Sequence, residues 1–348
     1  MPALLQTPNK TISKLIDIDK KPLYTAPMLE DADVSLLSLA QAAKAAGDPL
    51  RLSILKLLGQ GAFGVLELCR IFDIKQSSMS HHLKVLAQAG LASSQREGNS
   101  IFYRRPLTTG NDGMSEWLRS LYRAIDQTPN DDDVMHAVEK VLIERAEACA
   151  DFFARHADDF REQQDLIASY EQYGDALATI LDSFATQGER SGYALEVGPG
   201  EGAFLGVLSQ KFEQVVGLDI SPDMLAKAER FCQNAGLDNV TLLQGTTASV
   251  SIESVDFAVA NMVLHHVPSP KTIFQDVAQR LRPGGTFLVT DLCRHDQAWE
   301  RESCGDLWLG FEPADLSQWA VEAGLKEGQS QYSGLRNGFQ IQFRLFHA

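Results

Sequence analysis

The 348-residue chain, with 44% hydrophobic residues, is long enough for about two domains that each bury a core. No segment approaches the ~20 consecutive apolar residues of a membrane span, and Pro8, Lys10, Lys14 and Asp17 interrupt any signal-peptide core at the start. Five cysteines without a Cys-x-x-Cys pair predict a reduced, cytoplasmic protein and argue against a disulfide-stabilised secreted domain.

The formal net charge of −15 is divided unevenly along the chain. Residues 34–108 carry nine Lys or Arg against four Asp or Glu, a net charge of +5, and the remainder carries 22 against 42, a net charge of −20. A basic module attached to an acidic body predicts an anionic partner, such as nucleic acid, for residues 34–108 alone. Residues 1–33 are expected to form an N-terminal arm.

Apolar periodicity predicts short helices between residues 36 and 91, in the stretches "LLSLAQAAKAAGDPLRLSILKLLGQG", "GVLELCRIFDI" and "QSSMSHHLKVLAQAG". Asp48 before Pro49 is an N-cap followed by a first-turn proline, so a new helix begins there and is expected to end at Gly59 or Gly61. These breaks predict a compact group of helices.

The third of these helices has one apolar and one polar face. Met79, Leu83 and Leu86 form the stripe expected to pack inward. The opposite face presents small polar and basic side chains suited to base edges in the major groove: Gln76, Ser77, Ser80, His81 and Lys84. The alternative is a plain three-helix core whose polar face is only solvated.

After Gly90, the stretch "LASSQREGNSIFYRRPL" predicts a two-stranded hairpin that turns at Gly98-Asn99. Two helices followed by a basic hairpin are typical of a winged helix, in which Arg96 and Arg104 are expected to contact phosphates. The side chain of Arg105 is equally suited to contact phosphates.

The module at residues 36–108 resembles the ArsR/SmtB family of bacterial repressors, through "GDPLRLSILKLL", "ELCRIFDIKQSSMSHHLKVLAQAGL" and "REGNSIFYR". The resemblance implies that "QSSMSHHLKVL" is the recognition helix and that the protein is a homodimer on an inverted repeat of double-stranded DNA. Metal-sensing members often carry Cys-x-Cys where this chain has Gly64 and Leu66. Cys69 alone makes no thiolate site, so no metal is expected.

Residues 109–145 are expected to form a linker with dimerisation helices. An amphipathic helix is predicted before the break at Pro129-Asn130, and a helical run follows from 132 to about 167, spanning about 50 Å if continuous. We expect 115–143 to make the dimer contact, as in the resembling repressors, and 145–190 to cap the domain that follows.

From about residue 192 onward, strands alternate with helices, which predicts an α/β domain with a parallel sheet covered on both faces. This domain is expected to extend over 146–348. Ligands of such sheets bind at the carboxyl ends of the strands.

The stretch "LEVGPGEGAF" raises the question of which nucleotide would bind, because Gly198, Gly200 and Ala203 also fit a dinucleotide pattern. Glu196, before the first glycine, suits a ligand with an ammonium group and would repel a pyrophosphate. Asp219 follows the next strand, where a carboxylate can accept from ribose hydroxyls. Alternatively, Asp219 caps the helix that follows.

Residues 192–295 resemble class I methyltransferases, especially quinone-type and small-molecule enzymes, through "ALEVGPGEGAF", "VVGLDISPDML", "VDFAVANMVLHHV" and "LRPGGTFLVTDL". The resemblance implies a Rossmann-like, largely parallel seven-stranded sheet and a site for S-adenosylmethionine or S-adenosylhomocysteine. The implied ligand-binding residues are Glu196, Gly198, Gly200 and Gly202 for the methionine part, Asp219 for the ribose, Ile220 and Met224 for the adenine faces, and Thr246 and Asn261 nearby.

Two departures limit the chemistry. First, "QGTTAS" stands where many of these enzymes have Gly-Asp-Ala, so the contact to the adenine is expected to be altered. Second, "NMVLHH" stands in place of the Asn/Asp-Pro-Pro-aromatic signature of methyltransferases that act on amino groups, which argues against modification of DNA bases. His265 and His266 are either pocket wall or general bases. A minor hypothesis places Cys293, His295 and Cys304 at the same cavity, but arsenite methylation would require several converging thiols, so no catalytic residue is assigned.

The sequence thus favours a dimeric transcriptional repressor whose methyltransferase-like domain is a sensor, resembling regulators of the methionine cycle that respond to S-adenosylhomocysteine. The alternative is an active small-molecule methyltransferase that also regulates its own gene. An enzyme whose winged helix serves only protein contacts conflicts with the +5 charge of that module.

Overall fold

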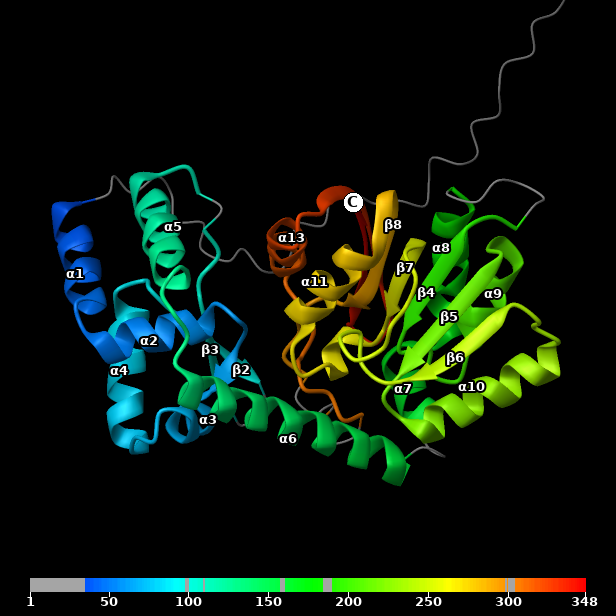
Figure 1. Cartoon of the computed structure of the whole chain (residues 1–348), viewed down its shortest axis with the longest axis horizontal. Helices are drawn as coiled ribbons and strands as arrows, with labels where there is room; N and C mark the ends of the chain where they lie inside the picture. The colour runs from blue at the N-terminus through cyan, green and yellow to red at the C-terminus, as the bar shows by residue number, and fades with distance from the viewer. Residues whose placement is uncertain are drawn as a thin grey trace, which may run out of the picture.

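The computed structural model describes residues 35–97, 100–108, 110–156, 160–183, 190–297, 299 and 304–348. The predicted N-terminal arm and the hairpin turn at Gly98-Asn99 lie outside these residues. A helical winged-helix part and an α/β part lie side by side, and one long helix, α6, runs from the first to beneath the second (Figure 1).

The winged-helix part follows the predicted order of elements. They are α1 (Leu36–Ala46), α2 (Pro49–Leu58), β1 (Phe63–Gly64), α3 (Val65–Ile71), α4 (Gln76–Gln88), β2 (Ser93–Glu97) and β3 (Ser100–Arg104). Strands β2 and β3 form the antiparallel wing hairpin, and β1 pairs with β3.

The local signals that predicted these helices are confirmed. The Asp48 carboxylate accepts a hydrogen bond from Arg51 N at 2.9 Å and caps α2, and Gly59 is its C-cap residue. In α4, Met79, Leu83 and Leu86 are fully buried. The apolar stripe therefore fixes which face of α4 remains exposed.

Helices α5 (Gly113–Asp126) and α6 (Asp132–His156) complete the winged-helix core. Tyr122 of α5 and Val138 and Val141 of α6 belong to the same buried cluster as α1 to α4. Their apolar faces are thus covered by this chain itself. Within the predicted helical run to 167, the structure describes α6 up to His156 and α7 (Phe160–Ala168).

The α/β part contains a seven-stranded sheet with the order β6-β5-β4-β7-β8-β10-β9. Strands β4 to β8 are parallel, and β10 is antiparallel to both β8 and β9. The strands are β4 (Tyr193–Val197), β5 (Gln214–Asp219), β6 (Val240–Gln244), β7 (Val255–Asn261), β8 (Leu281–Leu292), β9 (Lys326–Gly334) and β10 (Gln340–His347). The predicted seven-stranded, largely parallel sheet is confirmed.

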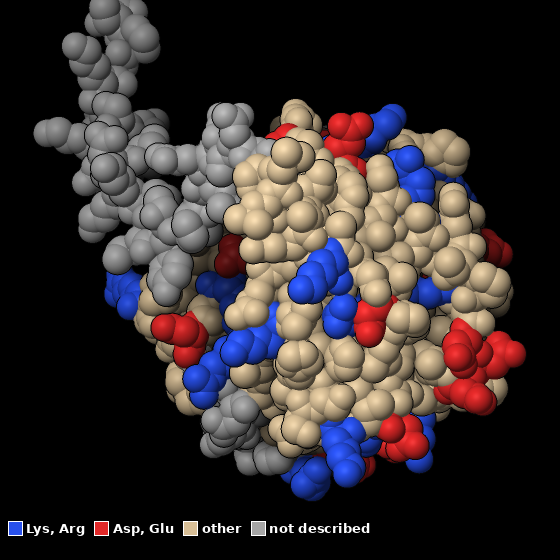
Figure 2. Space-filling view, turned by 90° about the vertical axis from the view of Figure 1, so that its left-hand side faces the viewer, with Lys and Arg blue, Asp and Glu red and all other residues tan. Residues whose placement is uncertain are grey.

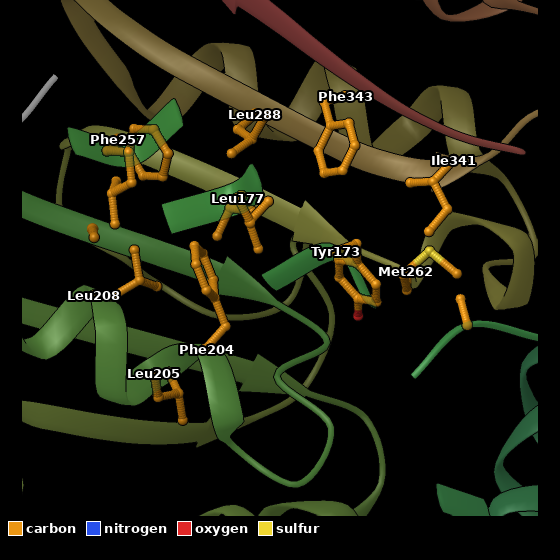
Figure 3. Packing of buried hydrophobic residues seen from close by; sticks show 14 of the residues in the cluster. Tyr173, Leu177, Phe204, Leu205, Leu208, Phe257, Met262, Leu288, Ile341 and Phe343 are labelled. Atoms are coloured by element: carbon orange, nitrogen blue, oxygen red, sulfur yellow. The ribbon is translucent and has the colours of Figure 1, made fainter. Parts of the chain in front are cut away.

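Helices cover both faces of this sheet, as buried parallel strands require. The helices are α8 (Tyr170–Asp182), α9 (Ala203–Lys211), α10 (Pro222–Ala235), α11 (Pro270–Arg280) and α13 (Pro313–Glu322), with the 3-10 turn η1 (Leu264–His266) after β7. On one face, Leu177 of α8 and Phe204 and Leu208 of α9 pack on Phe257 and Leu288 of the sheet (Figure 3). Helices α11 and α13 contribute to the core on the other face.

The wing is docked onto the α/β part. Phe102 of β3 meets Trp308 edge to face, with ring centroids 5.2 Å apart. Glu97, at the end of β2, is fully buried, where it pairs with Arg294 and accepts a hydrogen bond from Leu309 N at 2.9 Å. A buried, paired charge at this interface links the two parts specifically. Among the described helices, none is long and apolar enough to span a membrane.

Candidate ligand site and DNA-binding face

The carboxyl ends of β4, β5 and β7 carry the candidate ligand-binding residues. Glu196 of β4 is 1% exposed, and within the described residues its Oε2 atom has no hydrogen-bond partner. Burial raises the pKa of this carboxyl to about 8. A buried acceptor without a partner is costly, so the carboxylate is suited to a donor supplied by a ligand.

The turn after β4 is shaped by glycines in left-handed conformations. At Gly198, with φ +68°, a Cβ would lie 2.3 Å from Val263 Cγ2, whereas at Gly200, with φ +56°, a Cβ would meet nothing within 4 Å. Gly200 therefore borders open space that a ligand can approach. At Gly202 a Cβ would come within 3.2 Å of Ala228 Cα, so this glycine allows α9 and α10 to pack closely.

Asp219 ends β5 and accepts a hydrogen bond from Ser221 N at 2.8 Å. The cap of α10 is Ser221, whose hydroxyl accepts from Met224 N at 3.3 Å, so the alternative that Asp219 is the helix cap is wrong. Burial raises the pKa of Asp219 to about 6. Met224 is buried and Ile220 is half-buried next to Asp219 in the chain.

Thr246 and Asn261 differ in their surroundings. Thr246 is exposed, and its hydroxyl lies 3.1 Å from Ser249 Oγ in a turn after β6. Asn261 ends β7, hydrogen-bonds the Tyr173 hydroxyl, and has a buried Oδ1 without a partner among the described residues. Asn261 therefore shares the environment of Glu196 more closely than Thr246 does.

Two tyrosines of α8 border the Glu196 carboxylate, and the sequence did not indicate them. The negative charge of Glu196 contributes, after burial, to raising the pKa values of Tyr170 and Tyr173, to about 12 for Tyr170. Their ring centroids are 5.6 Å apart. The available signal was two tyrosines at i and i+3 of a helical segment that precedes the first strand of the sheet.

These features fit a ligand with an ammonium group and a ribose. The buried Glu196 carboxylate is suited to an ammonium group, the backbone at Gly200 leaves room for a connecting chain, and the Asp219 carboxylate is suited to accept hydrogen bonds from hydroxyls. S-adenosylmethionine and S-adenosylhomocysteine contain all three parts.

The wall of this site includes the far end of α6. Cys149 packs with Met224 and Phe152, and its Sγ lies 3.4 Å from the carbonyl oxygen of His266. Burial raises the pKa of Cys149 to about 12, and the charges of Asp219 and Asp306 add to the effect. Helix α6 therefore reaches Met224, and the charge of Asp219 acts on its Cys149.

His265 and His266 are both buried beside this wall. His265 Nδ1 lies 2.7 Å from Asp291 Oδ1, and burial lowers the pKa of His266 well below its ordinary value. Among the described residues, the titratable groups that converge within 4.8 Å of one another are His265, His266 and Asp306. Neither Cys293 nor Cys304 is part of that group, so no converging thiols favour arsenite chemistry.

The exposed face of α4 carries the polar residues predicted to read DNA. Gln76, Ser77, Ser80, His81 and Lys84 are all exposed, as is Arg96 of the wing. Lysines and arginines occur in small groups over this end of the molecule (Figure 2).

Arg104 requires a correction. Its guanidinium pairs with Asp315 of α13, a carboxylate that is 3% exposed. Arg104 therefore contacts the α/β part in this structure, and the phosphate contact predicted for it does not fit this placement. The sequence could not reveal this pair because 211 positions separate the two residues.

Comparisons with known proteins agree with this division of the chain. Residues 46–95 match the family model of a helix-turn-helix domain, and residues 195–289 match that of a methyltransferase domain. A ubiquinone biosynthesis O-methyltransferase of Methylococcus capsulatus is 27% identical over 147 residues, which cover 38% of this chain and 62% of that protein. An uncharacterised methyltransferase of Bacillus subtilis is 25% identical over 190 residues, which cover 54% of this chain and 71% of that protein.

Among solved structures, an N-methyltransferase from Bradyrhizobium japonicum in complex with S-adenosylhomocysteine is 17% identical, with a TM-score of 0.42. That similarity covers 55% of this chain and 98% of the other. The chain therefore contains a segment that matches a helix-turn-helix domain, followed by a segment that matches a methyltransferase domain and forms most of a seven-stranded, largely parallel sheet.

Proposed function

We propose that the protein is a ligand-responsive transcriptional regulator, in which the methyltransferase domain senses S-adenosylhomocysteine or S-adenosylmethionine and the winged helix binds operator DNA as a repressor. The observation that supports it best is the course of α6, which belongs to the winged-helix core at one end and to the ligand-site wall at the other (Figure 1). One rigid element thus contacts both functional surfaces.

The contacts along α6 follow one another closely. Val138 and Val141 are 2% and 3% exposed in the winged-helix core. One turn later, Arg145 makes two hydrogen bonds to Glu67 of α3, at 2.8 and 2.6 Å, and another to the carbonyl oxygen of Pro268 at 2.9 Å. One further turn brings Cys149 to Met224. A ligand that displaces Met224 would therefore act on the helix that supports α3.

Regulation requires that the ligand bind the DNA-competent and DNA-incompetent forms with different affinities. A shift from 1:99 to 99:1 needs about 5.5 kcal/mol of differential binding. In a homodimer two ligands contribute, so each must supply under about 3 kcal/mol. One repacked contact at Met224 and one altered ion pair at Arg145 can supply a binding free-energy difference of this size.

A homodimer on an inverted repeat would place two recognition helices on DNA. Leu36 and Leu37 of α1 are 86% and 68% exposed, and α1 lies at the end of the molecule farthest from the methyltransferase domain (Figure 1). Two neighbouring exposed leucines support pairing through α1.

The decisive experiment is fluorescence anisotropy of the full chain on DNA from its own upstream region, titrated separately with the two ligands. We expect S-adenosylhomocysteine to release the DNA at concentrations at which S-adenosylmethionine has no effect, as for regulators of methionine-cycle genes. If both ligands bind the protein and neither changes its affinity for DNA, the sensor function is wrong.

Two variants separate the sites. His81→Ala with Lys84→Ala should weaken DNA binding by tenfold or more and leave ligand affinity unchanged, because both side chains are exposed on α4. Asp219→Ala should abolish the ligand response and preserve basal DNA binding. Loss of both activities in either variant would mean that the change is only structural.

The second candidate is an active small-molecule methyltransferase that regulates its own gene. It is supported by the similarity to ubiquinone biosynthesis O-methyltransferases, which suggests a hydroxyl acceptor. Formation of S-adenosylhomocysteine from S-adenosylmethionine, stimulated by a panel of phenols and catechols, would favour this candidate. Tight ligand binding without stimulated turnover would favour the sensor.

A further inference from the structure

A cluster of nitrogen and oxygen donors lies outside the residues assigned to the ligand. His265 and His266 form the end of η1, after β7, and Asp306 lies in the segment between β8 and α13. All three are buried, with side-chain exposures of 2%, 6% and 0%. One donor atom of each residue lies within 4.8 Å of the others.

We propose that His265, His266 and Asp306 bind one divalent transition-metal ion of the zinc type. The ligand set of two imidazoles and one carboxylate favours Zn²⁺ or a similar ion over Mg²⁺ and Ca²⁺, which prefer oxygen donors only. Three protein donors leave one tetrahedral position for water or another small molecule.

The distances distinguish a shared ion from simple hydrogen bonds. His266 Nδ1 lies 3.4 Å from Asp306 Oδ1. Two donors on a tetrahedral zinc ion, each about 2.0–2.1 Å from it, are about 3.3 Å apart. By contrast, His265 Nδ1 lies 2.7 Å from Asp291 Oδ1, which is a hydrogen-bond distance.

Asp291 holds His265 as metal-binding histidines are usually held. Because Nδ1 faces Asp291, the ring nitrogen of His265 that would bind an ion is Nε2. The Asp291 carboxylate is fixed in turn by hydrogen bonds from Leu264 N at 2.9 Å and Leu292 N at 2.8 Å. Such outer carboxylates orient the ring and increase the basicity of the ligand.

The electrostatics also suit a cation. The carboxylate of Asp306 is fully buried, and a divalent ion would offset the cost of its charge. This inference does not depend on the regulatory function proposed above.

The test uses the full chain after removal of metals with a chelator, titrated with Zn²⁺ by calorimetry and with Co²⁺ by visible absorption. We expect one equivalent per chain and the intense absorption of a tetrahedral Co²⁺ site with nitrogen and oxygen ligands. No stoichiometric binding, or the spectrum of hydrated Co²⁺, would overturn the proposal. A sulfur-to-cobalt charge-transfer band would also overturn it, since it would assign the ion to a cysteine such as Cys149.

Variants locate the ion. His266→Ala and Asp306→Asn should each weaken Co²⁺ binding by at least 100-fold, and Asp291→Asn by about 10- to 100-fold. His295→Ala, which removes a nearby imidazole outside the cluster, should leave the affinity unchanged. Equal affinity in all four variants would contradict the assignment. The stoichiometry and spectrum of the unaltered protein keep the proposal testable even if a variant does not fold.

Discussion

The carboxyl group of Glu196 makes ligand binding depend on pH. Its pKa is about 8 in the ligand-free protein because the group is buried, and an ammonium ligand requires the ionised form. Below pH 8, binding must therefore release a proton, and we expect affinity for S-adenosylhomocysteine to fall by up to tenfold for each pH unit. Isothermal calorimetry between pH 6.5 and 8.5 measures this slope, and Asp219 contributes further only near pH 6.

Glu196→Gln should bind the ligand weakly with no such slope, and Glu201→Gln should behave as the unaltered protein, because Glu201 pairs with Lys227 at 3.0 Å.

The stability of the ligand-free protein should change with pH in the direction opposite to ligand affinity. The folded ligand-free state retains a proton on Glu196 that the unfolded chain releases, so its stability should decline from pH 4.5 to 8, by at most about 1.4 kcal/mol per unit. A pH-independent affinity would show that Glu196 does not meet the ammonium.

At this scale, sequence reasoning identified residues that act through local chemistry and missed those that depend on tertiary contacts. Glu196 lies near the end of β4, just before the glycine turn, and Asp219 ends the neighbouring parallel strand β5, so their placement at one sheet edge was predictable. Tyr173 lies near Glu196 because α8 packs over that edge of the sheet. Arg104 pairs with the carboxylate of Asp315, which is distant in sequence. Neither contact is encoded in a local pattern.

At the scale of elements, α6 predicts a way to separate ligand binding from its effect on DNA. Arg145→Ala removes the two hydrogen bonds to Glu67 and the one to Pro268. We expect the affinity for ligand and basal DNA binding to change less than threefold, while the ligand-induced change in DNA affinity falls at least tenfold. Anisotropy titrations with and without saturating S-adenosylhomocysteine measure that change.

The matched control is Arg70→Ala. Arg70 of α3 pairs with Glu144 of α6, but their side chains are 55% and 40% exposed, and such pairs contribute about 0–1 kcal/mol. Both variants thus remove an arginine contact between the same helices. If Arg70→Ala reduces the response as much as Arg145→Ala, or if Arg145→Ala leaves it intact, the buried contact does not carry the coupling.

The elements that sequence analysis predicted well are those with strong local signals. The helix at Pro49–Leu58 has an N-cap residue, a first-turn proline and a C-terminal glycine, and each was readable. Strand β9 was not predicted, because its residues are mostly polar and exposed and its pairing with β10 decides its conformation. The resemblance to dimeric repressors predicts a dimer contact at 115–143, and this stays a prediction, although part of the apolar surface of α5 and α6 packs on the chain's own helices.

At the scale of the whole molecule, the docked wing predicts that the two domains unfold together. Phe102 is 9% exposed at the boundary, and Glu97, fully buried there, pairs with Arg294 and accepts hydrogen bonds from Leu309 N and from the Gln95 side chain. Separation would remove the contacts of Glu97 with Arg294 and Leu309 and expose aromatic surface, which costs several kcal/mol. We expect one calorimetric transition for the full chain.

A saturating ligand should raise the temperature of that single transition, without splitting it. At 100 times its dissociation constant, it adds about 2.7 kcal/mol to the free energy of unfolding, and hydrogen exchange should slow in α3 and α4 as well as in β4 and β5. Glu97→Ala removes the boundary pair and should split the transition, whereas Arg190→Ala, which removes the exposed pair with Asp238, should not. The contrary outcome is two transitions in the unaltered protein, of which the ligand shifts only one. Ligand binding to the methyltransferase domain would then not stabilise the winged helix. The sensor function would need a route other than the contacts between the two parts.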